Sequence, residues 1–173
     1  MKIFETERLN IRRLTNEDED NLFLLNGNED VMRYIRPVGT KEESNKRLQE
    51  IIEKYSVYPN QSGWAVTLKS NDEFIGLMAV FPIENSSDIQ LGYSLIPQYW
   101  GNGYATEIAE CGIKHAFETI GLEILFANCE CANSASLNVI LKSGFVIEKN
   151  FWEEEKEVIR FQLTKEKYFN SLR

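Results

Sequence analysis

Two glycines separated by one asparagine, Gly101 and Gly103, interrupt the chain between an apolar run that ends near Leu95 and a helical pattern that starts at Tyr104. Glycine adopts backbone conformations that other residues rarely reach, so this spacing predicts a tight turn between a strand and a helix. The first N–H groups of such a helix have no partner within the helix and lie at the positive end of its dipole. The turn can therefore bind an anion through its backbone, without a basic side chain.

Two common phosphate-binding patterns do not fit this turn. A P-loop requires a lysine directly after its second glycine, and Tyr104 stands there instead. The dinucleotide fingerprint G-x-G-x-x-G/A requires glycine or alanine where Thr106 stands, and this turn lies past the middle of the chain, behind several strands. The remaining possibilities are a plain tight turn and a diphosphate seat formed by the amides of residues 101–106.

Strand and helix patterns alternate along the rest of the chain. Strand patterns cover residues 7–14, 63–69, 74–83, 88–96, 122–131, 145–152 and 157–164. Helix patterns begin at Thr15 or Asn16, recur around 31–35, and cover 41–58, 104–121 with Gly121 as the stop signal, and 133–144. This order predicts an α/β (α+β) fold with a single mixed, mostly antiparallel central sheet and helices on both faces.

Composition and charge exclude several classes of protein. The chain has 173 residues, 43% of them hydrophobic, which fits one domain spanning 1–173. A net charge of −8 without a basic cluster argues against binding to nucleic acid or to anionic membranes, and no apolar run approaches the ~18 residues of a membrane span. Three cysteines and one histidine do not form a zinc pattern, so no metal is expected. The odd cysteine count without a secretion signal predicts reduced thiols in a cytoplasm.

QYWGNGYATE, residues 98–107, contains the pattern Q/R-x-x-G-x-G/A in the form W-G-x-G-Y-A-T-E. With this motif the chain resembles the GNAT superfamily of N-acetyltransferases, in particular its RimJ/RimL-type branch. NSASLNVILKSGF, residues 133–145, resembles N-x-x-S-x-x-V-x-x-K-x-G-F, and ETERLNIRRL, residues 5–14, resembles the opening T-E-R-L-x-L-R. The three motifs follow the family order and span nearly the whole chain.

The resemblance implies that acetyl-CoA binds between two central strands that splay apart. The pantetheine arm enters this gap in the family, and the matching backbone here belongs to Tyr93, Ser94 and Leu95. An interior strand glycine, Gly92, suggests a bulge or a close backbone approach, and a bulge there would separate the strands. The diphosphate would lie on the glycine turn, with Gln98 at its start. The turn residues that would bind it are Gly101, Asn102, Gly103, Tyr104, Ala105 and Thr106.

The resemblance also implies that a primary amine attacks the thioester directly. Asn133 matches a family asparagine beside the pantetheine arm, and Ser136 matches a position suspected in this branch of protonating the departing thiolate. Helix capping is the alternative for both residues. The general base would be Glu155 in the acidic turn 153–155, with Glu107 in the glycine motif as another candidate, although an exposed structural position is open for each. A backbone amide near Leu95 would stabilise the oxyanion.

The acceptor amine is not named by any motif. By resemblance to the branch, the expected acceptor is a protein N-terminal α-amine, as in a ribosomal protein. A small-molecule amine (a polyamine, an amino acid or an aminoglycoside) and a non-catalytic acyl-CoA-binding module remain open. The expected state is a monomer or homodimer. Trp64 and Trp100 could form the wall of a substrate pocket, although the core is the expected place for each. His115 is expected beside a helix stripe without a chemical role.

Overall fold

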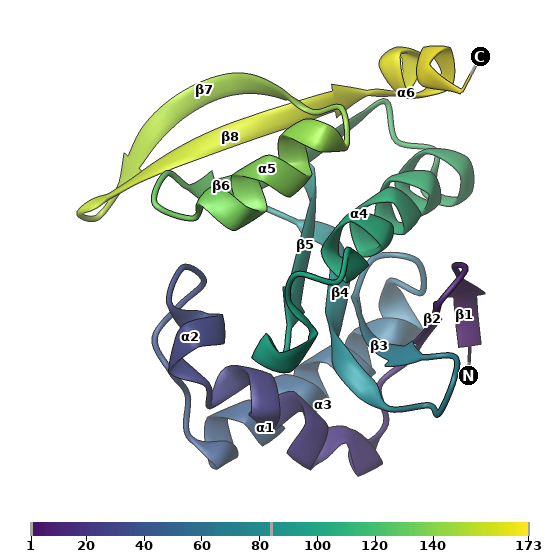
Figure 1. Ribbon diagram of the computed structural model, residues 1–173, viewed down its shortest axis with the longest axis vertical. Coiled ribbons are helices and arrows are strands. Elements are labelled where there is room, and N and C mark those ends of the chain that lie inside the picture. Colours follow the sequence, from purple (N-terminus) through teal and green to yellow (C-terminus); the bar gives the residue numbers. More distant parts are fainter. Residues whose placement is uncertain (1, 84, 173) are drawn as a thin grey trace.

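The strands form one sheet in the computed structural model, which describes residues 2–83 and 85–172 (Figure 1). Within these residues the sheet has eight strands in the order β1-β2-β3-β4-β5-β6-β8-β7. All neighbouring strands are antiparallel except β5 and β6, which are parallel. The strands are β1 (Lys2–Glu5), β2 (Leu9–Arg12), β3 (Gly63–Leu68), β4 (Phe74–Pro82), β5 (Ile89–Leu95), β6 (Ile124–Glu130), β7 (Val146–Glu153) and β8 (Lys156–Thr164).

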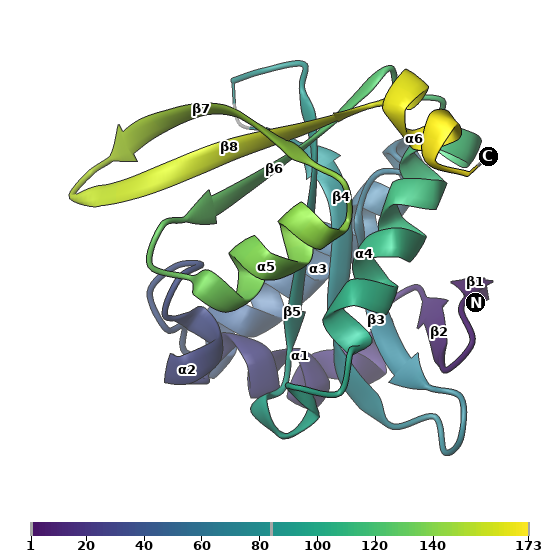
Figure 2. The same ribbon diagram turned by 45° about the horizontal axis from the view of Figure 1, so that its top comes forward.

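Helices cover both faces of this sheet, so the predicted fold class is confirmed. α4 and α5 lie in front of the sheet in Figure 1, whereas α3 lies behind it, and Figure 2 shows the same layers from a second direction. A π-helical turn, His115–Ile120, continues α4. The helices are α1 (Glu19–Asn26), α2 (Glu29–Met32), α3 (Lys41–Val57), α4 (Tyr104–Lys114), α5 (Ser134–Lys142) and α6 (Lys165–Ser171).

Two apolar clusters hold these layers together. Successive side chains of a strand point to opposite faces, so Trp64 of β3 lies in one cluster and its neighbour Ala65 in the other. The first cluster includes Ile108 of α4, and the second includes Leu22 of α1 and Leu48 of α3. Trp64 is fully buried, which confirms the prediction that it belongs to the core.

Several short features confirm predictions made from local patterns. The helix expected at 41–58 is α3, and the side chain of Thr40 caps it by accepting from the N–H of Glu43. Gly121 ends the π-helical turn with a φ of 80°, as the stop signal predicts. β1 and α6 have no counterpart among the strands and helices that the sequence predicts. No helix within the described residues is long and apolar enough to cross a membrane.

β5 and β6 separate along the sheet. Their register contains one pair, Gln90 with Phe126, although β5 continues to Leu95. β6 instead pairs along its whole length with β8 on its other side. The far half of β5 therefore has β4 on one edge and no paired strand on the other within the described residues, as the resemblance to splayed strands implies.

The predicted bulge at Gly92 is wrong. Gly92 pairs with Ala79 in an antiparallel register between β4 and β5 that has no break. The close backbone approach lies on the partner strand instead, where a Cβ at Gly76 would stand 2.2 Å from the carbonyl oxygen of Ser94. The strands thus separate because β6 follows β8, and the glycine that the geometry requires is Gly76.

Candidate functional site

The glycine turn follows the free end of β5. A short 3₁₀ turn, Pro97–Tyr99, leads from β5 to Gly101 and Gly103, whose φ angles are 75° and 80°. Both angles lie in the left-handed region that side chains disfavour, which explains the two glycines. α4 begins at Tyr104, and Gly103 at its N-cap position offers no side chain to the first N–H groups of the helix. These amides are therefore available to an anion.

Two side chains of the turn hold its shape. The indole Nε1 of Trp100 donates to the carbonyl oxygen of Leu95 at 2.8 Å, and the amide Nδ2 of Asn102 donates to the carbonyl oxygen of Trp100 at 3.0 Å. Trp100 is 49% exposed, so its predicted place in the core is wrong. Trp100 instead links the end of β5 to the glycine turn through this hydrogen bond. Gln98 is exposed at the start of the turn and lies where the motif predicts.

The free edge of β5 presents the backbone of alternate residues. The N–H of Ile96 donates to the carbonyl oxygen of Ile75 beside β4 at 2.9 Å. Backbone groups of successive strand residues point to opposite edges, so those of Leu95 and Tyr93 face the edge that β6 has left, and those of Ser94 face β4. Of the three residues predicted to pair with pantetheine, Tyr93 and Leu95 thus offer backbone groups at this edge.

Tyr93 and Ser136 meet across the gap between β5 and α5. The phenol oxygen Oη of Tyr93 lies 3.4 Å from Oγ of Ser136. Burial raises the pKa of Tyr93, and the hydrogen bond with Ser136 only partly opposes this shift. Tyr93 therefore stays protonated at neutral pH and can donate a proton. The family resemblance assigns a role only to the backbone of Tyr93, and the side-chain partner lies 43 residues away in the sequence.

Asn133 caps the helix that carries Ser136. Its side-chain Oδ1 accepts from the N–H of Ser136 at 3.2 Å, so capping is one role of Asn133. Ser136 takes part in this cap through its backbone, which leaves its hydroxyl for Tyr93. The cap thus fixes the position of the Ser136 hydroxyl at the first turn of α5.

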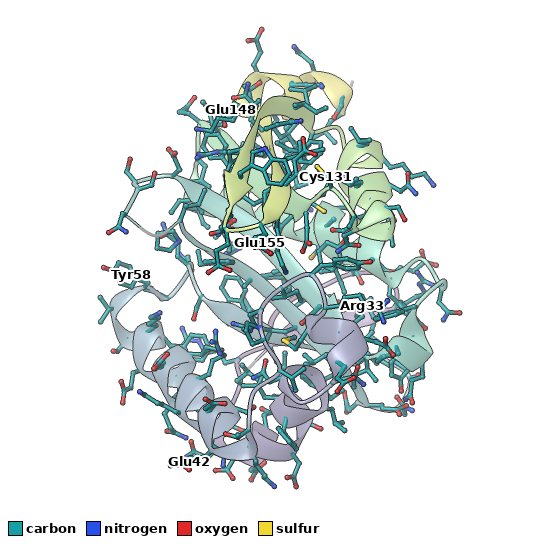
Figure 3. The ribbon with its side chains drawn as sticks, turned by 90° about the vertical axis from the view of Figure 1, so that its left-hand side faces the viewer. Arg33, Glu42, Tyr58, Cys131, Glu148 and Glu155 are labelled. Atoms are coloured by element: carbon teal, nitrogen blue, oxygen red, sulfur yellow. The ribbon has the colours of Figure 1, made fainter. Side chains whose placement is uncertain are left out.

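The two candidate bases differ in their surroundings. Glu107 of α4 accepts hydrogen bonds from the hydroxyl of Thr6 and from the backbone N–H and Nε of Arg8. A carboxylate held in this way is poorly suited to accept a proton. Glu155 is exposed in the two-residue turn between β7 and β8, after Glu154 with its left-handed φ of 54°. Figure 3 shows Glu155 at the end of the hairpin, on the side of the molecule that also carries Arg33.

The surroundings of His115 and Cys111 are those of structural residues. His115 is buried, its ring stacks on Phe4 with 5.0 Å between centroids, and Nε2 lies 3.0 Å from the carbonyl oxygen of Asn60. Burial lowers its pKa. Burial raises the pKa of Cys111 to about 12, which disfavours a reactive thiolate. No group of three potential metal-binding side chains occurs in residues 2–83 and 85–172.

The described residues fit an extended cofactor with a diphosphate and a thioester end. A Cβ at Gly101 would meet nothing within 4 Å, so a ligand has room against the turn. Open amides at the start of α4 suit phosphate oxygens, and the unpaired edge of β5 suits amide groups of an extended arm. Tyr93 and Ser136 lie beside that edge, where the arm would carry its thiol end.

The sequence matches a known family over most of its length. The family model described as an acetyltransferase (GNAT) domain matches residues 8–146. Among curated relatives, the uncharacterized N-acetyltransferase YoaA of Bacillus subtilis is 28% identical over 146 residues, which cover 83% of this chain and 82% of that protein. The spermidine N(1)-acetyltransferase of Escherichia coli is 26% identical over 148 residues, which cover 83% of this chain and 76% of that protein.

A solved structure shares the fold at low sequence identity. RimL, a ribosomal L7/L12 alpha-N-protein acetyltransferase in complex with coenzyme A, superimposes with a TM-score of 0.80. The match covers 95% of this chain and 98% of that one, at 17% identity. This likeness describes the fold alone.

Proposed function

Since this chain belongs to the GNAT acetyltransferase family, it is an N-acetyltransferase, and we propose that it transfers acetyl from acetyl-CoA to the α-amine of a protein N-terminus. Membership of the family favours an enzyme over a non-catalytic acyl-CoA-binding module. The observation that carries the proposed chemistry is the unpaired edge of β5, which leads directly into an open glycine turn at the start of α4.

The cofactor would bind along this edge. The diphosphate would accept hydrogen bonds from the amides of residues 101–106, and a pantetheine amide would pair with the backbone of Tyr93. The carbonyl oxygen of Leu95 is held by Trp100. The N–H of Leu95 faces the gap because backbone groups of successive strand residues alternate between the two edges of the strand, and there it would donate to the oxyanion that forms when the amine attacks the thioester.

The thiolate leaves as coenzyme A and needs a proton. The Ser136 hydroxyl would supply it, with Tyr93 within reach to replace it. A donor in this position supports loss of the thiol without a metal or a covalent intermediate on the protein.

The acceptor class follows from the exposure of the proposed base. Glu155 lies at a hairpin turn open to solvent, where water screens its interaction with a cationic amine. Deprotonation at pH ~7.4 costs about 4 kcal/mol for a lysine-like amine of pKa ~10.4, but only about 0.4 kcal/mol for an α-amine of pKa ~7.7. An exposed base therefore suits the α-amine.

A polyamine is the second candidate acceptor. Three consecutive carboxylates, Glu153, Glu154 and Glu155, are exposed at the end of the hairpin, and they would attract a cationic substrate. The relatives include a spermidine acetyltransferase. This acceptor would require the acidic turn to provide both binding and proton removal.

Release of coenzyme A from acetyl-CoA, followed with a thiol reagent, tests the acceptor. We expect turnover with peptides that carry a free N-terminus, and much less with N-blocked lysine peptides, spermidine or an aminoglycoside, because only the α-amine is substantially neutral at pH ~7.4. Reactions without acceptor correct for the protein's own thiols, Cys111, Cys129 and Cys131. A preference for spermidine would overturn the α-amine assignment and keep the enzyme.

Substituting Ser136 separates catalysis from helix capping. Ser136→Ala removes the hydroxyl but keeps the backbone N–H that Asn133 caps, so the helix is expected to remain intact. We expect kcat to fall about 100-fold, with the Kd for acetyl-CoA within twofold of wild type. Tyr93→Phe is the matched variant, since it removes the other hydroxyl of the pair. Full turnover in Ser136→Ala, with loss in Tyr93→Phe, would transfer the donor role to Tyr93.

A further inference from the structure

The ion pair between Arg8 and Glu107, called the brace, joins the glycine turn to the start of the chain. Arg8, between β1 and β2, and Glu107, in the first turn of α4, are 99 residues apart in sequence. One carboxylate oxygen of Glu107 accepts from the backbone N–H of Arg8 at 2.9 Å, and the other accepts from Nε of Arg8 at 2.7 Å. The hydroxyl of Thr6 donates to the same carboxylate. The carboxylate thus holds both the backbone and the side chain of Arg8.

The guanidinium of Arg8 in turn contacts Asn102 and Tyr104 and lies beside Gly103. Nη1 donates to the carbonyl oxygen of Asn102 at 3.0 Å, and the planar group lies over the ring of Tyr104 at 4.4 Å from its centroid. Nη2 lies 3.5 Å from the place that a Cβ on Gly103 would occupy. One side chain therefore fixes the peptide that joins Asn102 to Gly103 and the first residue of the helix.

The brace is charged on both sides. Burial raises the pKa of Glu107, but hydrogen bonds from Thr6 and Arg8 outweigh this effect, and the net pKa lies below its ordinary value. The carboxylate is ionised at neutral pH, so its hydrogen bonds with Arg8 are charge-assisted. Only an arginine has a planar fork that can meet a carboxylate, a carbonyl oxygen and an aromatic face at once.

Such a brace has a clear use beside two glycines. Glycine residues have the most backbone freedom to lose, so a Gly-Asn-Gly turn is costly to order when a ligand binds. A turn already held in its binding conformation avoids that cost, and the gain appears as affinity. Trp100 links the turn to β5 and Asn102 bonds within it, and Arg8 adds a restraint on the peptide between Asn102 and Gly103.

We propose that Arg8 and Glu107 preorganise the glycine turn for the cofactor's diphosphate, with Arg8 as a positioning residue that acts through Asn102 and Tyr104. This inference rests on the proposed function, since it assumes that the turn binds the diphosphate of acetyl-CoA. It predicts that loss of Arg8 weakens ligands with a diphosphate and spares ligands without one.

Calorimetric titration of the intact protein with coenzyme A and with pantetheine tests the brace. Arg8→Gln is expected to weaken coenzyme A about tenfold, the usual scale for a lost charge-assisted hydrogen bond, and to leave the pantetheine Kd within twofold. Amide hydrogen exchange of residues 101–106 in the ligand-free protein is expected to accelerate by a similar factor. Equal losses for both ligands, or unchanged exchange, would overturn the brace.

Two further variants separate positioning from charge. Arg33→Gln removes the same charge from an exposed pair with Asp30, and both Kd values are expected to stay at wild type. Arg8→Lys keeps the charge but cannot meet Glu107 and Asn102 together, so it should behave like Arg8→Gln. If Arg8→Lys bound coenzyme A as tightly as wild type, the role of Arg8 would be electrostatic attraction of the diphosphate and not positioning of the turn. If the wild-type protein bound coenzyme A and pantetheine with the same Kd, the diphosphate seat itself would be refuted.

Discussion

Gly103→Glu is expected to abolish useful binding of acetyl-CoA. The φ of 80° at Gly103 is left-handed, so any side chain there costs about 1–2 kcal/mol of strain. The new carboxylate would stand at the open amides of α4 and repel the diphosphate, and two like charges 4 Å apart near a protein surface cost about 4 kcal/mol before salt screening. We expect the Kd for coenzyme A, measured by calorimetry, to rise about 100-fold or more.

Gly121→Ala is the matched control for this substitution. Gly121 has the same φ of 80°, and a Cβ there would meet nothing within 4 Å, but it ends the helix that Gly103 begins. Backbone strain alone should therefore lower stability in this variant and leave coenzyme A affinity within twofold of wild type. If Gly103→Glu bound coenzyme A as tightly as wild type, the diphosphate seat would be misplaced.

Gly76→Ala should destabilise the protein severely. A Cβ at Gly76 would lie 2.2 Å from the carbonyl oxygen of Ser94 and 3.1 Å from Cα of Leu95, and both atoms belong to the backbone of β5. A rotamer change cannot relieve these contacts, so β4 and β5 must move apart. We expect urea unfolding to show a loss of about 3 kcal/mol, at the upper end of the usual cost of overpacking.

The movement of β5 away from β4 should also disturb the cofactor site. The backbone of Leu95 is the proposed oxyanion donor, so any folded Gly76→Ala protein should also show a lower kcat. Gly63→Ala in β3 is the control, because the nearest atoms to its Cβ would be 3.6 Å away, in the flexible side chain of Ile51. We expect its stability within about 1 kcal/mol of wild type. Equal stability of the two variants would contradict the close approach of β4 and β5.

Local patterns were sufficient where one stretch of chain decides the outcome. The left-handed turn at Gly101 and Gly103 and the helix capped at Thr40 follow from neighbouring residues, and the structure has them where the sequence predicts them. The family motifs likewise identified an N-acetyltransferase. The roles of Ser136 and Glu155, the RimJ/RimL branch, the single-domain organisation and the cytoplasmic location stay predictions.

Tertiary structure decided whatever depends on residues that are distant in sequence. Nothing near Gly92 reveals that the strands separate because β6 follows β8, or that the required glycine is Gly76 on the partner strand. Trp100, which the sequence places in the core, lies at the surface instead. Its indole N–H donates there to the carbonyl oxygen of Leu95.

The sequence by itself determined most of the elements, the glycine turn and the family, because periodicity and backbone preference act over a few residues. Only the tertiary structure joined Arg8 to Glu107 and Tyr93 to Ser136. These pairs form when strand order and helix packing bring distant segments together, and no local preference of either residue contains that information.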